Sequence, residues 1–302
     1  MSLLIKRPTR ILVQGITTTE GRQNTSSMLE YKAEVVAGVS PGKYGQEVMG
    51  VPVYDKVSEA VKRHPVDLSV VFVPRNAVVS AVLEAAGEHI PLVIVCTEGI
   101  SVPEILKLKN QAREKGTMIL GPGSAGILVP GETKAGFISG EYVQKGEVAV
   151  IARTMGNENK LCQSMYKEEL GESIVVSLGG GDIIGTGYVE VLEALREEPT
   201  TEVVVIGGEI SSRLEEDAAR FISESEYPYP VLAYLFDREK DPDAAQEKER
   251  VLREAGVTVA DDIWEIGQII KEAMEMEEEE EEPGGGEAPG DEEDDEEDAD
   301  EE

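Results

Sequence analysis

Aromatic side chains are scarce in this sequence of 302 residues, in which Phe, Trp and Tyr together make up 5%. The core must therefore be packed mainly from Val, Ile, Leu and Ala, which is typical of parallel strands covered by helices. No apolar run is long enough to span a bilayer, so we expect no transmembrane helix. The only cysteines are Cys96 and Cys162, both inside apolar runs, and we expect reduced, buried thiols rather than a disulfide.

Basic residues are also in the minority, with 28 Lys and Arg against 61 Asp and Glu. This balance argues against a nucleic-acid binder, because a phosphate backbone needs a basic face. Residues 277–302 are almost entirely acidic or small, and we expect a disordered tail there, either merely solvated or binding a partner. The first eight residues lack the apolar core of a signal peptide, so we expect a cytoplasmic protein.

Apolar runs and helical patterns alternate along most of the chain. Between residues 10 and 123 we expect strands at 10–15, 34–39, 68–74, 92–97 and 117–120, each followed by a helix or a turn. Residues 121–146 are rich in Gly and Pro and read as a linker or a small hairpin. The alternation then restarts and continues to about residue 274. The sequence therefore predicts an α/β fold with two domains, 1–146 and 147–276, followed by the tail 277–302.

Four turns of the first domain should meet at one edge of its sheet, where nucleotides bind in such folds. They are Thr17-Thr18-Thr19-Glu20, Ser40-Pro41-Gly42-Lys43, Val73-Pro74-Arg75-Asn76 and Cys96-Thr97-Glu98-Gly99. The first turn offers hydroxyls and helix N-terminal amides to a phosphate, and Lys43 adds a cation. Pro74 offers an apolar ledge to an adenine ring, and Glu98 can accept from a ribose or an amide. Each turn alone could be an ordinary turn, but together they favour a nucleotide-like ligand.

The order of the motifs resembles the α subunit of succinyl-CoA synthetase (succinate–CoA ligase, nucleoside-diphosphate-forming). The matching pieces are Gln14-Gly-x-Thr-x₃-Gly21, Gly38-Val-Ser-Pro-Gly-Lys43, Gly50-Val-Pro-Val53, Phe72-Val-Pro74, Thr97-Glu-Gly-Ile100, Gly121-Pro122, Pro130-Gly-Glu132, Gly179-Gly-Gly-Asp182 and Ile206-Gly-Gly-Glu-Ile210. The resemblance implies a Rossmann-like CoA-binding domain followed by a flavodoxin-like domain. It places the coenzyme A contacts at Thr17, Thr18, Thr19, Glu20, Lys43, Cys96, Thr97 and Glu98.

The same resemblance implies a partner, an ATP-grasp β-type subunit, through which alone a Mg-nucleotide would be bound. It also implies a small acid substrate. The chain departs from the family at several positions: Thr18 replaces a glycine, Gly123 replaces an asparagine, and Asn159 replaces a tyrosine. Of the hydroxyls that begin the family's phosphate-binding helix, only Thr154 remains.

The largest departure concerns a histidine. The family passes phosphate through a histidine on a Gly-His-Ala-Gly loop, whereas residues 236–242 of this chain lead almost directly into the next helix. The only histidines, His64 and His89, belong to the first domain, where we expect both on the surface. Without an imidazole nucleophile this route gives no phosphoenzyme, so we predict no catalytic residue and no metal site. Glu209, which steadies the histidine in the family, is left as an ordinary strand-end carboxylate.

Three hypotheses remain open from the sequence. The first is a CoA-binding α-type subunit of an acyl-CoA synthetase, with the phosphohistidine step lost or altered. The second is a non-catalytic CoA-binding or regulatory protein derived from the same family. The third is a purely structural partner subunit, which would fit the altered turns at Thr18, Gly123 and Asn159.

Overall fold

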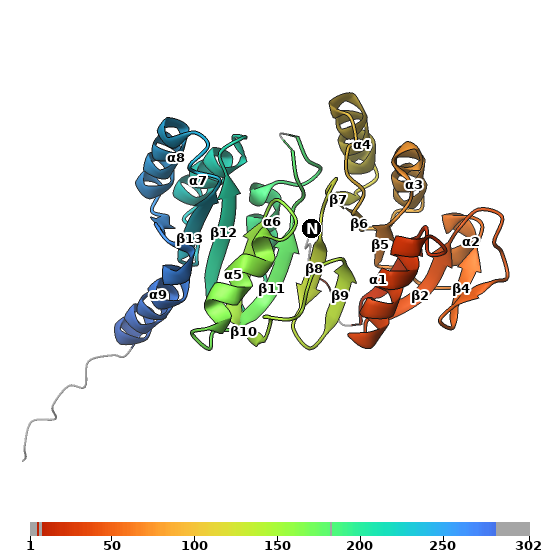
Figure 1. Ribbon diagram of the computed structural model, residues 1–302, viewed down its shortest axis with the longest axis horizontal. Helices are drawn as coiled ribbons and strands as arrows, with labels where there is room; N and C mark the ends of the chain where they lie inside the picture. Colours follow the sequence, from red (N-terminus) through yellow and green to blue (C-terminus); the bar gives the residue numbers. More distant parts are fainter. Residues whose placement is uncertain (1–4, 6–7, 182, 282–302) are drawn as a thin grey trace, which may run out of the picture.

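Two seven-stranded sheets stand side by side in the computed structural model, which describes residues 5, 8–181 and 183–281 (Figure 1). The first sheet is built from the red to yellow part of the chain and the second from the green to blue part. Helices cover both sheets, so the predicted α/β fold with two domains is confirmed. None of the helices in the described part of the chain is both long and apolar enough to cross a membrane.

The first sheet has the strand order β3-β4-β2-β1-β5-β6-β7. Its strands are β1 (Arg10–Gln14), β2 (Glu34–Val39), β3 (Glu47–Val48), β4 (Val51–Tyr54), β5 (Leu68–Val71), β6 (Leu92–Val95) and β7 (Met118–Leu120). Its helices are α1 (Thr19–Glu30), α2 (Val57–Val61), α3 (Arg75–Gly87) and α4 (Val102–Glu114). All pairs except the short β3–β4 pair are parallel, as the alternation of strands and helices predicts.

The second sheet has the order β14-β13-β12-β10-β11-β8-β9. Its strands are β8 (Gly126–Val129), β9 (Thr133–Gly136), β10 (Lys145–Ala152), β11 (Glu172–Ser177), β12 (Val203–Glu209), β13 (Val231–Phe236) and β14 (Thr258–Val259). Its helices are α5 (Asn157–Tyr166), α6 (Tyr188–Leu195), α7 (Leu214–Glu224), α8 (Pro242–Glu254) and α9 (Ile266–Glu281), with the 3₁₀ turn η1 (Ile263–Glu265). The strands read as continuous β-branched runs because helices cover both of their faces.

The Gly/Pro-rich segment after β7 forms a hairpin, not a linker. Strands β8 and β9 pair antiparallel with each other, and β8 pairs antiparallel with β11 of the second sheet. The sheets therefore part between Leu120 and Gly126, before the predicted domain boundary at residue 146. The hairpin can join the second sheet because Gly126 and Gly136 pack backbone to backbone, where a Cβ on Gly126 would lie 1.9 Å from the oxygen of Ala135.

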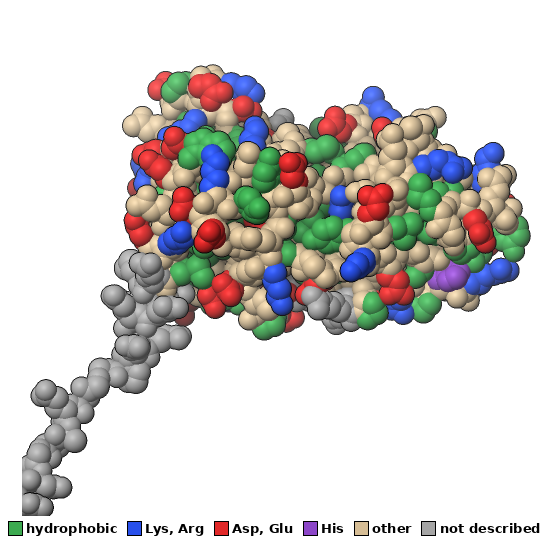
Figure 2. Space-filling model, turned by 60° about the horizontal axis from the view of Figure 1, so that its bottom comes forward, with side chains coloured by type: hydrophobic (Ala, Val, Ile, Leu, Met, Phe, Trp, Pro, Cys, Tyr) green, Lys and Arg blue, Asp and Glu red, His purple; other side chains and the backbone are tan. Residues whose placement is uncertain are grey.

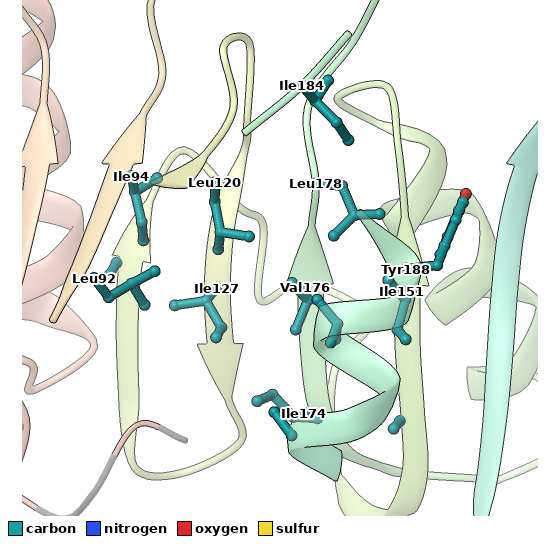
Figure 3. Packing of buried hydrophobic residues seen from close by; sticks show 14 of the residues in the cluster. Leu92, Ile94, Leu120, Ile127, Ile151, Ile174, Val176, Leu178, Ile184 and Tyr188 are labelled. Atoms are coloured by element: carbon teal, nitrogen blue, oxygen red, sulfur yellow. The ribbon is translucent and has the colours of Figure 1, made fainter. Parts of the chain in front are cut away.

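Each sheet packs its two faces against different helices. In the first sheet, Ile11 and Val13 face the same cluster as Met28 of α1, whereas Leu12 packs with side chains of α2, α3 and α4. In the second sheet, one face packs against α5 and α9 and the other against α6, α7 and α8. Figure 3 shows Ile94 and Leu120 near Ile127 and Val176, and all four belong to one buried cluster, so the core continues from the first sheet into the second.

The structure also bears on the predictions for the cysteines and for the C-terminal tail. Cys96 and Cys162 are free and buried, as predicted. Helix α9 extends to Glu281, so the backbone of residues 277–281 is helical, in contrast to the disordered tail predicted from residue 277. The rest of that tail lies outside the described residues. On the face drawn in Figure 2, acidic and basic side chains are interspersed over both domains.

Glu172 at the start of β11 gives the second domain a pH-dependent stability. Its side chain is buried, its Oε2 accepts from the amide of Gln144 at 3.0 Å, and its Oε1 has no hydrogen-bond partner among the described residues. Burial raises the pKa of Glu172 to about 7. The folded state therefore binds more protons than the unfolded state between about pH 5 and 7. Stability contributed by this group is present at low pH and is lost as the pH rises through 7.

We expect the difference in unfolding free energy between wild type and Glu172→Gln to change by about 2–3 kcal/mol from pH 5 to pH 8. Urea unfolding at both pH values measures it, and the comparison with the glutamine variant removes the shared effect of the other carboxylates. Parallel pH profiles for the two proteins would contradict the assignment.

Candidate functional site

Four turns meet at the carboxyl edge of the first sheet, because β2, β1, β5 and β6 are parallel neighbours. Their hydroxyls join one turn to the next. Thr17 Oγ1 lies 2.9 Å from Ser40 Oγ, and Thr97 Oγ1 donates to the carbonyl oxygen of Val73 at 2.8 Å. The sequence therefore correctly brings these turns to one edge, which we call the CoA rim and define as residues 15–22, 40–44, 73–76 and 96–99.

Thr18 is primarily a helix cap. Its Oγ1 accepts from the amide of Gly21 at 2.9 Å and donates to the oxygen of Gly15 at 2.8 Å. Such a cap typically stabilises a helix by about 1 kcal/mol, which accounts for a threonine at this position without a ligand. Helix α1 consequently begins at Thr19. The hydroxyl of Thr18 is thus committed to the fold.

The amides of Thr19 and Glu20 provide the anion-binding potential of the rim. Both residues are exposed, and neither amide donates a hydrogen bond within the described residues. The first amides of a helix lack intrahelical acceptors and carry the positive end of the helix dipole. This pair of free donors is therefore suited to a phosphate.

Three cations belong to the same rim. Arg22 reaches the carbonyl oxygen of Thr17 with its Nε at 3.3 Å, Lys43 is exposed on the second turn, and Arg75 begins α3. Arg75 also reaches towards the fourth turn, since a Cβ on Gly99 would lie 3.8 Å from its Cδ. Within the described residues none of these three cations forms an ion pair, although the chain is strongly acidic. They remain available to an anionic ligand.

The other predicted contact residues differ in accessibility. Pro74 and Glu98 are exposed, while Thr97 is half-buried with its hydroxyl bound to Val73. Cys96 is 3% exposed and burial raises the pKa of its thiol, so its side chain is a core residue. Only the backbone of Cys96 could meet a ligand. Glu98 points instead to the neighbouring turn, where a Cβ on Gly123 would lie 3.2 Å from its Cγ.

The second domain has a buried charge cluster at the carboxyl end of β10. Arg153 is fully buried, its Nη1 donates to Ser212 Oγ at 2.8 Å, and its Nη2 donates to the oxygen of Gly181. The same Nη1 lies 3.6 Å from both Glu209 Oε2 and Glu215 Oε1. We call these residues, with the neighbouring Lys248 and Glu216, the Arg153 cluster.

Lys248 of α8 completes the cluster. Its Nζ donates to Glu215 Oε2 at 2.9 Å and to Glu216 Oε2 at 2.8 Å. Glu215 thus lies between two cations, and it also accepts from the amide of Glu209 at 2.9 Å. The cluster binds the end of β12 to α7 and α8. Its outermost carboxylate is Glu209, whose side chain is 12% exposed.

Carboxylates occupy the N-terminus of α5. The amide of Gly156 donates to both oxygens of Glu158, at 2.9 and 3.0 Å, and the amide of Thr154 donates to Glu209 Oε1 at 3.2 Å. Burial raises the pKa of Glu158, while the hydrogen bond from Gly156 opposes that rise. The amides at which a phosphate is expected from the resemblance therefore already have acceptors in this chain.

A short seam joins the CoA rim to the Arg153 cluster. The amide of Gly121 donates to the oxygen of Leu178 at 2.7 Å, and the amides of Gly180 and Gly185 donate to the oxygens of Pro122 and Gly121 at 3.2 and 2.9 Å. The two glycine turns touch so closely that a Cβ on Gly179 would lie 2.4 Å from the oxygen of Pro122.

Beyond the seam, the contacts continue into both sites. On one side Glu98 borders Gly123, and on the other a Cβ on Gly180 would lie 3.5 Å from Thr154 Oγ1. The seam thus places the two candidate sites next to each other.

The histidines lie elsewhere. His64 is half-buried, and its Nε2 is 2.8 Å from the hydroxyl of Tyr54. His89 is exposed, with its Nδ1 3.3 Å from the oxygen of Lys115. At the second domain, β13 ends at Phe236 and α8 begins at Pro242, which confirms the short connection expected between them. Within that connection Lys240 pairs with Asp237 at 2.7 Å.

A cavity of about 590 Å³ lies away from both sites, between the α4–β7 side of the first domain and the helices α6 and α7. Its lining combines Met118, Val189 and Phe221 with charged groups such as Arg113 and Glu193. None of the predicted contact residues lines it.

Two known protein families match this chain, one in each domain. The CoA binding domain family matches residues 6–99, which contain the CoA rim, and the CoA-ligase family matches residues 154–265. The α subunit 2 of ADP-forming succinate–CoA ligase from Archaeoglobus fulgidus is 36% identical over 289 residues, covering 91% of this chain and 100% of that protein. The chain belongs to the succinate–CoA ligase α-subunit family. The α subunit from Staphylococcus epidermidis agrees, with 34% identity over 288 residues, 90% of this chain and 95% of that protein.

Several solved structures of other proteins share the fold of this chain. The ATP citrate lyase from Methanothrix soehngenii, in complex with citrate and coenzyme A, superposes with a TM-score of 0.80 at 19% identity. That match covers 94% of this chain but only 53% of the lyase chain. The dinucleotide-forming acetyl-coenzyme A synthetase 1 of Ca. Korarchaeum cryptofilum gives a TM-score of 0.70 at 22% identity, covering 84% of this chain and 58% of the synthetase.

Sequence reasoning missed several residues of this α-subunit-like chain that the structure brings to the sites. Arg22 was hidden because it lies one residue beyond the glycine of the first turn, and Arg153 because it directly follows an apolar strand. For Arg153 a signal did exist, since a lone arginine at the end of such a strand needs a buried partner. Lys248 gave no signal, because its partners are more than thirty residues away.

Proposed function

We propose that this chain is the CoA-binding α-type subunit of an acyl-CoA synthetase, succinate–CoA ligase-like, that acts with an ATP-grasp β-type subunit. The observation that carries the proposal is the CoA rim, where two free helix amides lie among cations that have no ion pair in the described residues. The family assignment and the matching CoA binding domain support coenzyme A as the ligand.

In the proposed complex, the amides of Thr19 and Glu20 and the ammonium group of Lys43 bind the diphosphate of coenzyme A. Thr17 and Thr18 position the first turn through their hydroxyl hydrogen bonds. Pro74 and the backbone of Cys96 and Thr97, with the side chain of Glu98, border the pantetheine arm. Because Glu98 lies at the seam, the thiol end of the coenzyme is directed towards Thr154 and Glu209.

We further propose that the phosphohistidine step is absent from this chain. Three features support this: no histidine follows β13, the α5 amides are bound by Glu158 and Glu209, and Lys240 in the short connection is close enough to Glu209 to feel its charge. An anionic phosphohistidine at this place would face two carboxylates that already hold the donors. Acyl transfer would then use an acyl phosphate formed at the partner subunit.

The test combines this chain with an ATP-grasp β-type subunit of a succinate–CoA ligase. We expect turnover that depends on a small acid, coenzyme A and ATP together, without transfer of label from γ-labelled ATP to this chain. Turnover with label on this chain, stable in base and labile in acid, would show that a phosphohistidine forms after all. His89→Gln serves as a control and should leave turnover unchanged.

The occupied N-terminus of α5 also favours a second candidate, a non-catalytic CoA-binding or regulatory protein. In that case the purified chain binds coenzyme A, as calorimetry would show, but supports no acyl-CoA formation with any β-type subunit. Absence of coenzyme A binding would leave only a structural role.

A further inference from the structure

A group of aromatic and basic side chains stands beside Lys43 and has no role in the site described so far. The ring of Tyr44 is 54% exposed, although it is a large apolar surface. It meets the ring of the buried Tyr54 edge to face, with 6.1 Å between the centroids. The guanidinium carbon of Arg63 lies 5.9 Å from the Tyr44 ring and 5.6 Å from the Tyr54 ring.

This group is held in place from behind. The hydroxyl of Tyr54 lies 2.8 Å from Nε2 of His64, and Tyr54 itself ends β4, a parallel neighbour of β2. Asp55 Oδ1 accepts from the amides of both Lys43 and Tyr44, at 2.9 and 3.0 Å. The turn that carries Lys43 and Tyr44 is therefore fixed with respect to the strand that carries Tyr54, and Arg63 is positioned by cation–π contact with both rings.

The guanidinium of Arg63 contacts the two tyrosine rings, but no acidic group neutralises its charge within the described part of the chain. No carboxylate forms an ion pair with it, whereas Arg238, Arg250 and Arg253 of the second domain all have acidic partners. The acidic groups nearest along this turn are committed elsewhere: Asp55 binds the two amides, and Glu59 Oε2 accepts from the amide of Asp55 at 3.3 Å. An exposed ring beside a guanidinium without an ion pair matches a nucleoside whose ribose carries a phosphate.

We propose that Tyr44 and Arg63 form a subsite for the 3′-phosphoadenosine end of coenzyme A, with the ring stacking on the adenine and the guanidinium binding the 3′-phosphate. The inference rests on the coenzyme A binding proposed above and adds the group that selects this coenzyme. Coenzyme A differs from dephospho-coenzyme A only in its 3′-phosphate. Lys43 and the α1 amides, one residue and one strand away, would bind the diphosphate that both compounds share.

Calorimetric titration of the full-length chain with coenzyme A and with dephospho-coenzyme A tests the subsite. The wild type is expected to bind coenzyme A about tenfold more tightly, as one charge-assisted contact allows. Arg63→Gln is expected to abolish this preference and leave the affinity for dephospho-coenzyme A unchanged. Lys62→Gln, an exposed neighbour with the same charge change, should keep the preference. Tyr44→Ala is expected to weaken both ligands equally, about fivefold, and Tyr44→Phe to change neither.

Each alternative outcome overturns a different statement. Equal affinity of the wild type for the two compounds, or equal weakening of both by Arg63→Gln, would reject the 3′-phosphate subsite but leave coenzyme A binding intact. An unchanged affinity in Tyr44→Ala would reject the stacking of the adenine. If the wild type bound neither compound, the proposed function itself would fail. Thermal unfolding of each variant checks that the fold is retained.

Discussion

Replacing Arg153 with methionine is expected to lower the free energy of unfolding by about 3–5 kcal/mol. The substitution removes a fully buried cation and leaves Glu209 and Glu215 without it in a region of low polarity. A buried carboxylate that loses a cationic partner keeps the cost of its desolvation. Removing one member of such a cluster is therefore more destabilising than replacing the whole cluster with apolar residues. Urea unfolding, followed by circular dichroism, measures the change.

Two further variants make this expectation specific. Arg250→Met removes an exposed arginine that is paired with Glu247 and Glu254, and its unfolding midpoint should barely move. Adding Glu209→Gln to Arg153→Met should recover part of the lost stability, because one of the abandoned charges disappears. If Arg153→Met were as stable as Arg250→Met, the cluster would contribute nothing to the fold.

Reversing the charge of Lys43 is expected to weaken coenzyme A binding by about 30- to 100-fold. An ammonium group beside a diphosphate becomes a carboxylate, so attraction is replaced by repulsion at short range. Calorimetric titration of Lys43→Glu against the wild type measures the effect. Because the turn is exposed, salt screens both proteins, and the difference between them should shrink as ionic strength rises.

Lys107→Glu is the matched control for this variant. Lys107 is exposed on α4 and is not part of the CoA rim, so the same change in net charge should leave the affinity within a factor of about two. An unchanged affinity in Lys43→Glu would show that Lys43 does not lie at the phosphates. An equal loss in both variants would mean that only net charge matters.

The edge of the first sheet could be predicted from the sequence because each of its parts is local. A strand, a turn and a helix follow one another within about twenty residues, and parallel pairing then brings all four turns to the same side. Thr17, Lys43 and Thr97 therefore lie where the pattern placed them. The pattern could not predict which partner each hydroxyl binds. A threonine that caps a helix and one that contacts a phosphate look alike in sequence.

Long-range pairing explains why the hairpin joins the second sheet and why the sequence did not reveal the Arg153 cluster. The hairpin β8–β9 belongs to the second sheet because β8 pairs with β11, which lies about fifty residues further along. Likewise, Arg153 meets Ser212 and Glu215 only after β12 has been placed beside β10. Nothing in the composition of residues 121–146 or 153–156 encodes those contacts locally. The extension of α9 beyond residue 276 was missed because a glutamate run is compatible with both helix and coil.

The backbone bonds between the Gly121–Pro122 turn and the strand end at Leu178 have a mechanical consequence. These hydrogen bonds connect the first domain to the second domain, which carries Glu209. A rotation of one domain relative to the other would have to break them. In the proposed binding mode, coenzyme A anchored by its adenosine must cross the distance with its own flexible pantetheine chain. The length of the pantetheine chain then limits how far the thiol extends. An analogue with a shorter chain would bind by its adenosine, but its thiol would not come near Glu209.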